Sequence, residues 1–112
     1  MTSVPRLKAG IFIRALIRRA EVEGASAFIA RKGSEEAGAI ILKVATLDGE
    51  VLLLNQARDG KGGLVWARPF GGKVPEARAA EWCARQAQFD PDVWILEIED
   101  RQGRAFVDEP VV

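Results

Sequence analysis

Apolar residues recur along this chain at two different spacings, one typical of helices and the other of strands. They predict two helices and about five strands. Residues 9–23 repeat apolar side chains at helical spacing, and the predicted inner face of this helix is Ile13, Leu16, Ile17 and Ala20. A second helix is predicted to begin at Val74-Pro75-Glu76, because proline is tolerated in a first helical turn. Its inward stripe is predicted to consist of Ala80, Cys83, Ala84 and Ala87.

Short apolar runs separated by turn residues predict the strands. They occupy residues 26–32, 37–46, 51–56, 64–70 and 93–99. Asp48-Gly49 is a hairpin signal between two of them, and residues 105–109 could add one more short strand. The order α-β-β-β-β-α-β predicts a single α+β domain over residues 1–112. We expect an antiparallel-rich mixed sheet of about five strands with two covering helices.

The strands share a second regularity, since each face begins with apolar residues and ends with a charge. Strand side chains alternate between faces, which groups Ile29 with Arg31, Ile41 with Lys43, Trp66 with Arg68, and Ile95 with Glu97 and Glu99. If these faces coincide, the sheet has an apolar half and a charged half. The candidate binding residues are therefore Arg31, Lys43, Arg68, Glu97 and Glu99.

Charge is also divided between the two ends of the chain. Residues 1–32 carry seven basic and two acidic side chains, and residues 89–112 carry seven acidic and two basic ones. Opposite blocks on one short chain most simply neutralise each other, within the molecule or across a dimer. On this interpretation Glu97 and Glu99 balance basic residues on neighbouring elements.

Composition removes several kinds of chemistry. The chain has no histidine and no tyrosine, so Ser-His and Cys-His nucleophilic machinery and Cys/His zinc sites are excluded. The single cysteine, Cys83, excludes an internal disulfide and suits a reducing compartment. The N-terminal segment lacks the apolar core of a secretory signal, although its arginines are also typical of transit peptides. These features argue against an enzyme and predict a cytoplasmic protein without cofactors or membrane contact.

Several alternatives stay open at this level. Glu97 and Glu99, together with Lys43, could serve a carboxylate/metal-dependent hydrolase or nuclease, because hard cations bind such oxygens. Pro91-Asp92 invites comparison with restriction-endonuclease-like cores, but no Glu-x-Lys follows. The basic first helix could bind nucleic acid weakly through Arg14, Arg18 and Arg19. The segment "FGGKVPE" places Lys73 before a helix start, where anions are favoured, but it does not match a P-loop.

Three stretches also resemble a known family. They are "PRLKAGIFIRALIRRAEVEG", "ARKGSEEAGAIILKV" with the following "LDG", and "FDPDVWILEIEDR". Together they are similar to short alphaproteobacterial proteins that are known only as a domain of unknown function. The resemblance is most specific at Arg31-x-Gly33, at Ala37-Gly38 with Lys43, and at residues 89–101. It implies a bacterial, cytoplasmic setting and carries no catalytic residues to transfer.

The sequence therefore favours a binding domain over an enzyme. We expect protein–protein contact, with an unknown partner or a second copy in a homodimer, through an edge strand or the charged half of the sheet. Among the tryptophans, Trp66 and Trp94 are predicted core residues, and Trp82 is the one most available to a partner.

Overall fold

The computed structural model describes residues 8–112. The first seven residues lie outside this range, and with them Arg6 of the basic block and the start of the segment weighed as a targeting sequence. Neither 14-residue helix within the described range is long and apolar enough to cross a membrane.

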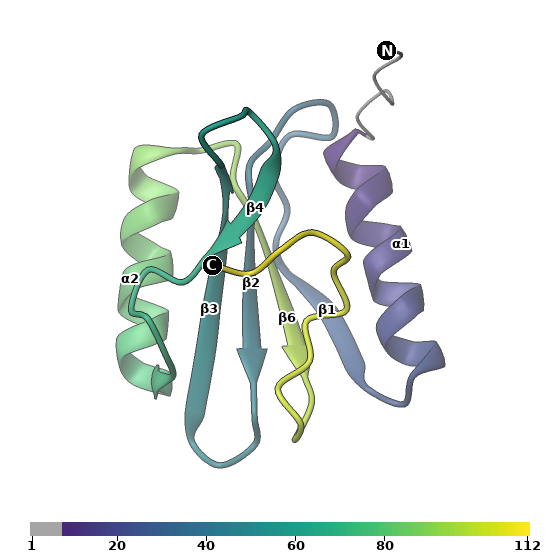
Figure 1. The fold of residues 1–112 in the computed structure, drawn as a ribbon. Coiled ribbons are helices and arrows are strands. Elements are labelled where there is room, and N and C mark those ends of the chain that lie inside the picture. The colour runs from purple at the N-terminus through teal and green to yellow at the C-terminus, as the bar shows by residue number, and fades with distance from the viewer. Residues whose placement is uncertain (1–7) are drawn as a thin grey trace.

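Two helices and six strands follow one another over residues 8–112 (Figure 1). Their bounds are α1 Ala9–Val22, β1 Ser26–Arg31, β2 Ile40–Ala45, β3 Glu50–Arg58, β4 Leu64–Ala67, β5 Val74–Pro75, α2 Glu76–Phe89 and β6 Trp94–Glu99. The predicted order is confirmed, with the two-residue β5 as an addition. Pro75 caps α2 instead of lying within it, because its extended backbone still pairs with β3.

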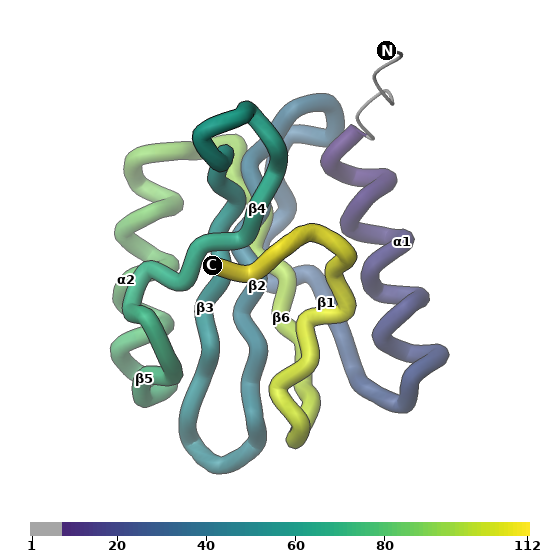
Figure 2. Tube along the Cα trace, viewed as in Figure 1, coloured from purple at the N-terminus to yellow at the C-terminus, as the bar shows by residue number. Residues whose placement is uncertain are grey.

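The strands form one mixed sheet in the order β1-β6-β2-β3-β4, and β5 pairs separately with β3. β6 runs parallel to β2, and every other pairing is antiparallel. The tube in Figure 2 shows β6, the last strand along the sequence, between the edge strand β1 and the central strand β2. The structure thus confirms the predicted α+β class and its antiparallel-rich mixed sheet.

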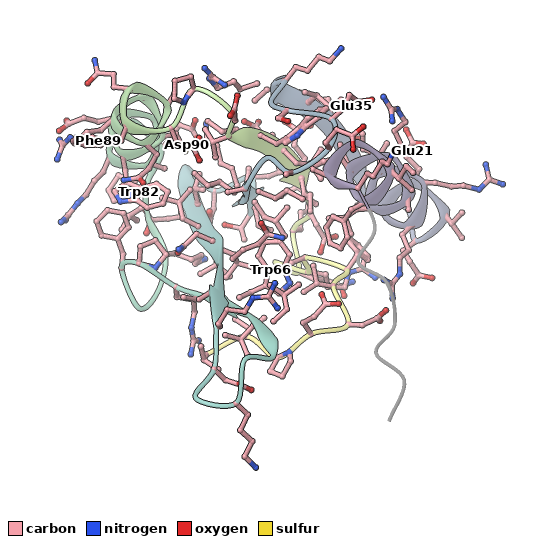
Figure 3. All side chains as sticks on the ribbon, turned by 90° about the horizontal axis from the view of Figure 1, so that it is seen from above. Glu21, Glu35, Trp66, Trp82, Phe89 and Asp90 are labelled. Atoms are coloured by element: carbon pink, nitrogen blue, oxygen red, sulfur yellow. The ribbon has the colours of Figure 1, made fainter. Side chains whose placement is uncertain are left out.

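The two helices cover opposite faces of the sheet, which gives the domain two apolar cores. On the α1 side, Ile13 and Leu16 pack against alternate strand residues, including Leu42, Trp66, Trp94, Leu96 and Ile98. On the α2 side, Ala79 and Cys83 pack against the strand residues that point to the other face of the sheet, including Ile41, Val51, Leu53 and Ile95. Figure 3 shows Trp66 near the centre of the molecule, and it and Trp94 are almost fully buried, as predicted.

The inward stripe of α2 differs from the predicted one. Ala79 and Cys83 are buried, whereas Ala80 and Ala84 are exposed. The prediction of an inward Ala80 and Ala84 was wrong because α2 contacts β3 and β5 near one side of the sheet, which turns its apolar face. Trp82 is half-buried and packs edge-on against Phe70, with ring centroids 6.2 Å apart.

The C-terminal segment closes one edge of the sheet instead of adding a strand at residues 105–109. Ala105, Phe106 and Val107 pack against the α1-side core without regular pairing. Beyond them the Trp66 backbone N donates to the Pro110 carbonyl, and the Val112 N donates to the Trp66 carbonyl, both at 2.8 Å. This segment therefore lies along the outer side of β4, where Figure 1 shows the C-terminus.

The loop from Lys32 to Ala39 is clamped onto the start of β6. The Trp94 indole N donates to the Ser34 carbonyl at 2.7 Å, and the Ser34 N donates to the Asp92 carbonyl at 3.0 Å. A Cβ at Gly33 or Gly38 would lie only 2.2 or 2.3 Å from the Asp92 carbonyl oxygen. The two glycines of the "RKGSEEAG" stretch therefore serve a close backbone approach.

The basic and acidic ends of the chain meet in part. Arg19 holds Asp108 through two hydrogen bonds of 2.5 and 3.2 Å, and Arg104 lies 3.8 Å from Glu23. Other charges of the N-terminal block find partners elsewhere, because Arg14 donates at 2.6 Å to Glu35 in the loop after β1. The expected neutralisation of the basic block by the acidic block is confirmed for Arg19 and Asp108, whereas Arg104 and Glu23 are the minority charges of their blocks.

Candidate functional site

The two edges of the sheet differ. The C-terminal segment lies along β4, whereas β1 pairs with β6 on one side and, among the described residues, with no strand on the other. Its residues are mostly exposed, and they include two large apolar side chains, Phe28 at 46% and Ile29 at 41% exposure. An edge strand with unpaired backbone groups is a template for another chain. We define Ser26–Arg31 as the β1 edge.

Near the β1 edge, the α1-side face of the sheet is covered more than the α2-side face. α1 contacts β1, while the main contacts of α2 are with β3 and β5 at the other end of the sheet. Phe28 lies opposite Glu97 on β6, and Ser26 lies opposite Glu99. The half-exposed Phe28 ring is thus next to the charged residues that the sequence singled out.

Lys43 is the centre of that charged group. The parallel pairing of β2 with β6 places it directly opposite Glu97, and the Lys43 Nζ lies 3.3 Å from the Glu97 Oε1. The same ammonium donates at 2.5 Å to Glu76, the first residue of α2. The Lys43 side chain is only 11% exposed, against 17% for Glu97 and 52% for Glu76. A nearly buried cation is therefore bracketed by two carboxylates.

This environment keeps Lys43 charged. Burial by itself would lower the pKa of Lys43, but the hydrogen bond to Glu76 and the negative charge of Glu97 outweigh it and raise the pKa. Burial also raises the pKa of the Cys83 thiol, against the opposing influence of Lys43. Neither group is prepared to act as a nucleophile, because both are held in their protonated forms.

The five predicted binding residues do not form one cluster. Lys43 and Glu97 meet, and Glu99 lies on the same face of β6 with Ala45 and Ser26 as its strand neighbours. Arg31 instead donates to the backbone carbonyls of Pro91 and Val93, both at 2.9 Å. Arg68 lies past β4 and donates at 3.2 Å to the Val112 carbonyl.

The structure also shows the surroundings of the metal site and the anion site that the sequence left open as alternatives. Within residues 8–112, no group of three or more carboxylates and thiols is arranged to hold a metal ion. Lys73 of the "FGGK" turn lies 3.2 Å from Asp48, whose carboxylate also accepts from Thr46 at 2.6 Å. Those hydrogen bonds, from the hydroxyl first and then from the ammonium, lower the pKa of Asp48 to about 2.

A pocket of about 410 Å³ opens between the start of α1, the loop after β1, and strands β3 and β4. Its polar lining is largely engaged in the fold. The Lys8 ammonium lies 3.3 Å from Glu36, Gln56 accepts from the Ile40 backbone N at 2.8 Å, and Glu109 accepts from the Trp66 indole at 3.0 Å. The pocket therefore offers polar and apolar surface in similar measure, with most of its polar side chains already bonded within the fold.

Sequence reasoning did not select Phe28 and Ile29. The signal was present, because two large apolar residues stand side by side in "SAFIARK" and must point to opposite faces of one strand. Only the position of β1 at the end of the sheet makes both of them accessible.

Fold and site together describe a small α+β domain with one covered and one open sheet edge. A family model described as "Protein of unknown function (DUF1491)" matches residues 7–108, and the chain belongs to this DUF1491 family. The resemblance seen in the sequence is thereby confirmed. No curated protein matches the chain.

Solved structures of the family share this fold. A crystal structure of a DUF1491 family protein from Caulobacter crescentus is 42% identical, with a TM-score of 0.89, and the match covers 96% of this chain and 100% of that one. An NMR structure of a C. crescentus family protein, also 42% identical, has a TM-score of 0.85 over 97% and 99% of the chains. A solution structure of protein Atu0922 from A. tumefaciens is 32% identical, with a TM-score of 0.73 over 85% and 86%. These sources are alphaproteobacteria.

Proposed function

We propose that this protein is a protein–protein interaction domain whose contact surface is the β1 edge with the adjoining α2-side face. The observation that carries the proposal is the contrast between the two edges. One is closed by the C-terminal segment, and the other presents Phe28 and Ile29 at 46% and 41% exposure.

Strand addition explains how such an edge would bind. The outward N–H and C=O groups of β1 can pair with an extended segment of a partner, which supplies affinity without a deep pocket. Side chains on the two faces of the strand then supply selectivity. Phe28 offers apolar area on the α2 side, and Ile29 does so on the α1 side, since its strand partner is the buried Leu96.

The Lys43 cluster gives this surface a polar border. Its carboxylates are not neutralised completely, because one ammonium serves both Glu76 and Glu97 and Glu99 lies beyond it on the same face. Charges at the border of an interface act mainly on partner choice and association rate. The cytoplasm is the compartment that we propose for this contact, on the basis of the single unpaired cysteine.

A paired substitution tests the proposal. Phe28→Lys places a charge on the edge strand, while Phe89→Lys changes a phenylalanine that is 80% exposed at the end of α2 (Figure 3), the helix whose main contacts are with β3 and β5. Tagged wild type and variants are incubated with alphaproteobacterial extract, cross-linked and quantified by mass spectrometry. Phe28→Lys should abolish the specific adducts, and Phe89→Lys should retain them.

A second variant separates lost binding from lost folding. Ile29→Lys alters the opposite face of the same strand, and circular dichroism establishes which variants stay folded. Equal adduct yields for wild type and both folded β1 variants would contradict the proposed surface.

A further inference from the structure

We infer that the occupant of the β1 edge is a second copy of this chain, paired antiparallel as β1 against β1 around a two-fold axis. This inference rests on the proposed function, because it names the partner of the same edge. It would join the sheets of two protomers into one continuous sheet.

The first argument is the charge polarity of the edge. At the start of β1 lie Glu21 at the end of α1 and Glu99 opposite Ser26, whereas Glu23 beside them lies 3.8 Å from Arg104 of its own chain. At the other end of β1 lie Arg31 and Lys32. The turn from α1 and the loop toward β2 are at opposite ends of the strand in Figure 1.

This polarity distinguishes the two ways in which identical strands can pair. An antiparallel pair brings the acidic start of one strand beside the basic end of the other, twice by symmetry. A parallel pair would place like charges together, which is unfavourable across neighbouring strands. The edge is therefore complementary to itself in the antiparallel direction.

The second argument concerns the centre of the strand. Phe28 and Ile29 lie between the charged ends, so an antiparallel pair brings the apolar residues of both copies together on each face of the joined sheet. The chain has zero formal net charge, so no long-range repulsion opposes the association of two copies.

The third argument is that the two edges are not equivalent. Because the C-terminal segment covers β4, a head-to-tail array of β1 against β4 would have to displace its backbone hydrogen bonds to Trp66. In a pair of β1 with β1, each copy uses its single open edge, so the assembly closes as a dimer.

Charge reversal tests this arrangement. Sedimentation equilibrium of the wild type should show a concentration-dependent dimer. Lys32→Glu and Glu21→Lys should each weaken the dimer about tenfold, since each removes two symmetric attractions and adds two repulsions. The double variant should return to within about threefold of the wild type. Lys61→Glu, in the exposed turn before β4 at the other side of the sheet, is the matched control and should leave the dimer unchanged.

Each outcome decides the inference. A wild type that stays monomeric at several hundred micromolar would overturn it, and so would a dimer that is insensitive to both charge reversals and to Phe28→Lys. If the protein is monomeric but Phe28→Lys still abolishes its adducts in extract, the edge binds a different protein. The proposed function then stands and the homodimer does not. Recovery in the double variant supports the antiparallel pairing.

Discussion

Replacing Lys43 by methionine should destabilise the domain far more than replacing an exposed lysine. The substitution keeps most of the side-chain volume but removes the cation that lies 3.3 Å from Glu97 and is hydrogen-bonded to Glu76. Two carboxylates are then left near each other without a counter-charge, one of them only 17% exposed. The expected loss of stability arises as much from leaving Glu76 and Glu97 without a counter-charge as from losing their attraction to the ammonium.

The expected magnitude lies between two limits. Removing one partner of a fully buried ion pair costs about 3–5 kcal/mol, and an exposed pair contributes about 0–1 kcal/mol. Glu76 is half-exposed and can turn toward water, so we expect about 2–3 kcal/mol for Lys43→Met. In a domain of this size that corresponds to a fall in Tm of about 10 °C.

Urea denaturation at pH 7 measures the effect, with Lys73→Met as the matched control because Lys73 and Asp48 form an exposed pair at 3.2 Å. The control should lose much less stability than Lys43→Met, because exposed ion pairs are screened by water. The double variant Lys43→Met with Glu97→Gln should recover part of the loss, since one abandoned charge is gone. Equal losses for Lys43→Met and Lys73→Met would refute the idea that this ion pair is structurally important.

Three further features of the fold, at Gly38, Asp48 and Cys83, can be tested separately. Gly38→Ala should cost about 1–3 kcal/mol in urea denaturation because its Cβ would lie 2.3 Å from the Asp92 carbonyl, while Gly60→Ala, which meets nothing within 4 Å, should cost little. Asp48 should titrate near pH 2 by NMR, so the stability that it contributes is full above about pH 4 and is lost as the pH falls toward 2, a loss that Asp48→Asn should remove. Cys83 should react slowly with a thiol reagent in the native protein and rapidly in denaturant, because burial raises the pKa of its thiol.

The alternation of apolar and polar residues was sufficient to predict which side chains of a single strand share a face. Alternation in β6 placed Trp94, Leu96 and Ile98 on the face that α1 covers, and it put Ile95 and Glu97 on the other. The expectation that Glu97 and Glu99 balance basic residues on neighbouring elements is confirmed for Glu97, because β2 and β6 pair in register, but Glu99 forms no ion pair with another described residue. The pairing of β2 with β6 is what brings Lys43 and Glu97, which alternation placed on one face, into contact.

Pattern was insufficient where the contact depended on strand order. Arg31 and Arg68 were grouped with Lys43 by alternation alone, but β1 and β4 are at opposite ends of the sheet and each arginine bonds to a nearby backbone carbonyl. The exposure of Ala80 on α2 has a similar origin, since helix periodicity does not say which part of a sheet the helix will cover.

The open β1 edge is the central claim, and amide hydrogen exchange of Ser26–Arg31 tests it most directly. Exchange is compared between dilute protein and protein in complex, either concentrated alone or bound in alphaproteobacterial extract. We predict slower exchange confined to β1, with no change at the end of α2 near Phe89. Unchanged exchange in β1 under conditions where the protein is demonstrably bound, with protection at another surface, would contradict the account.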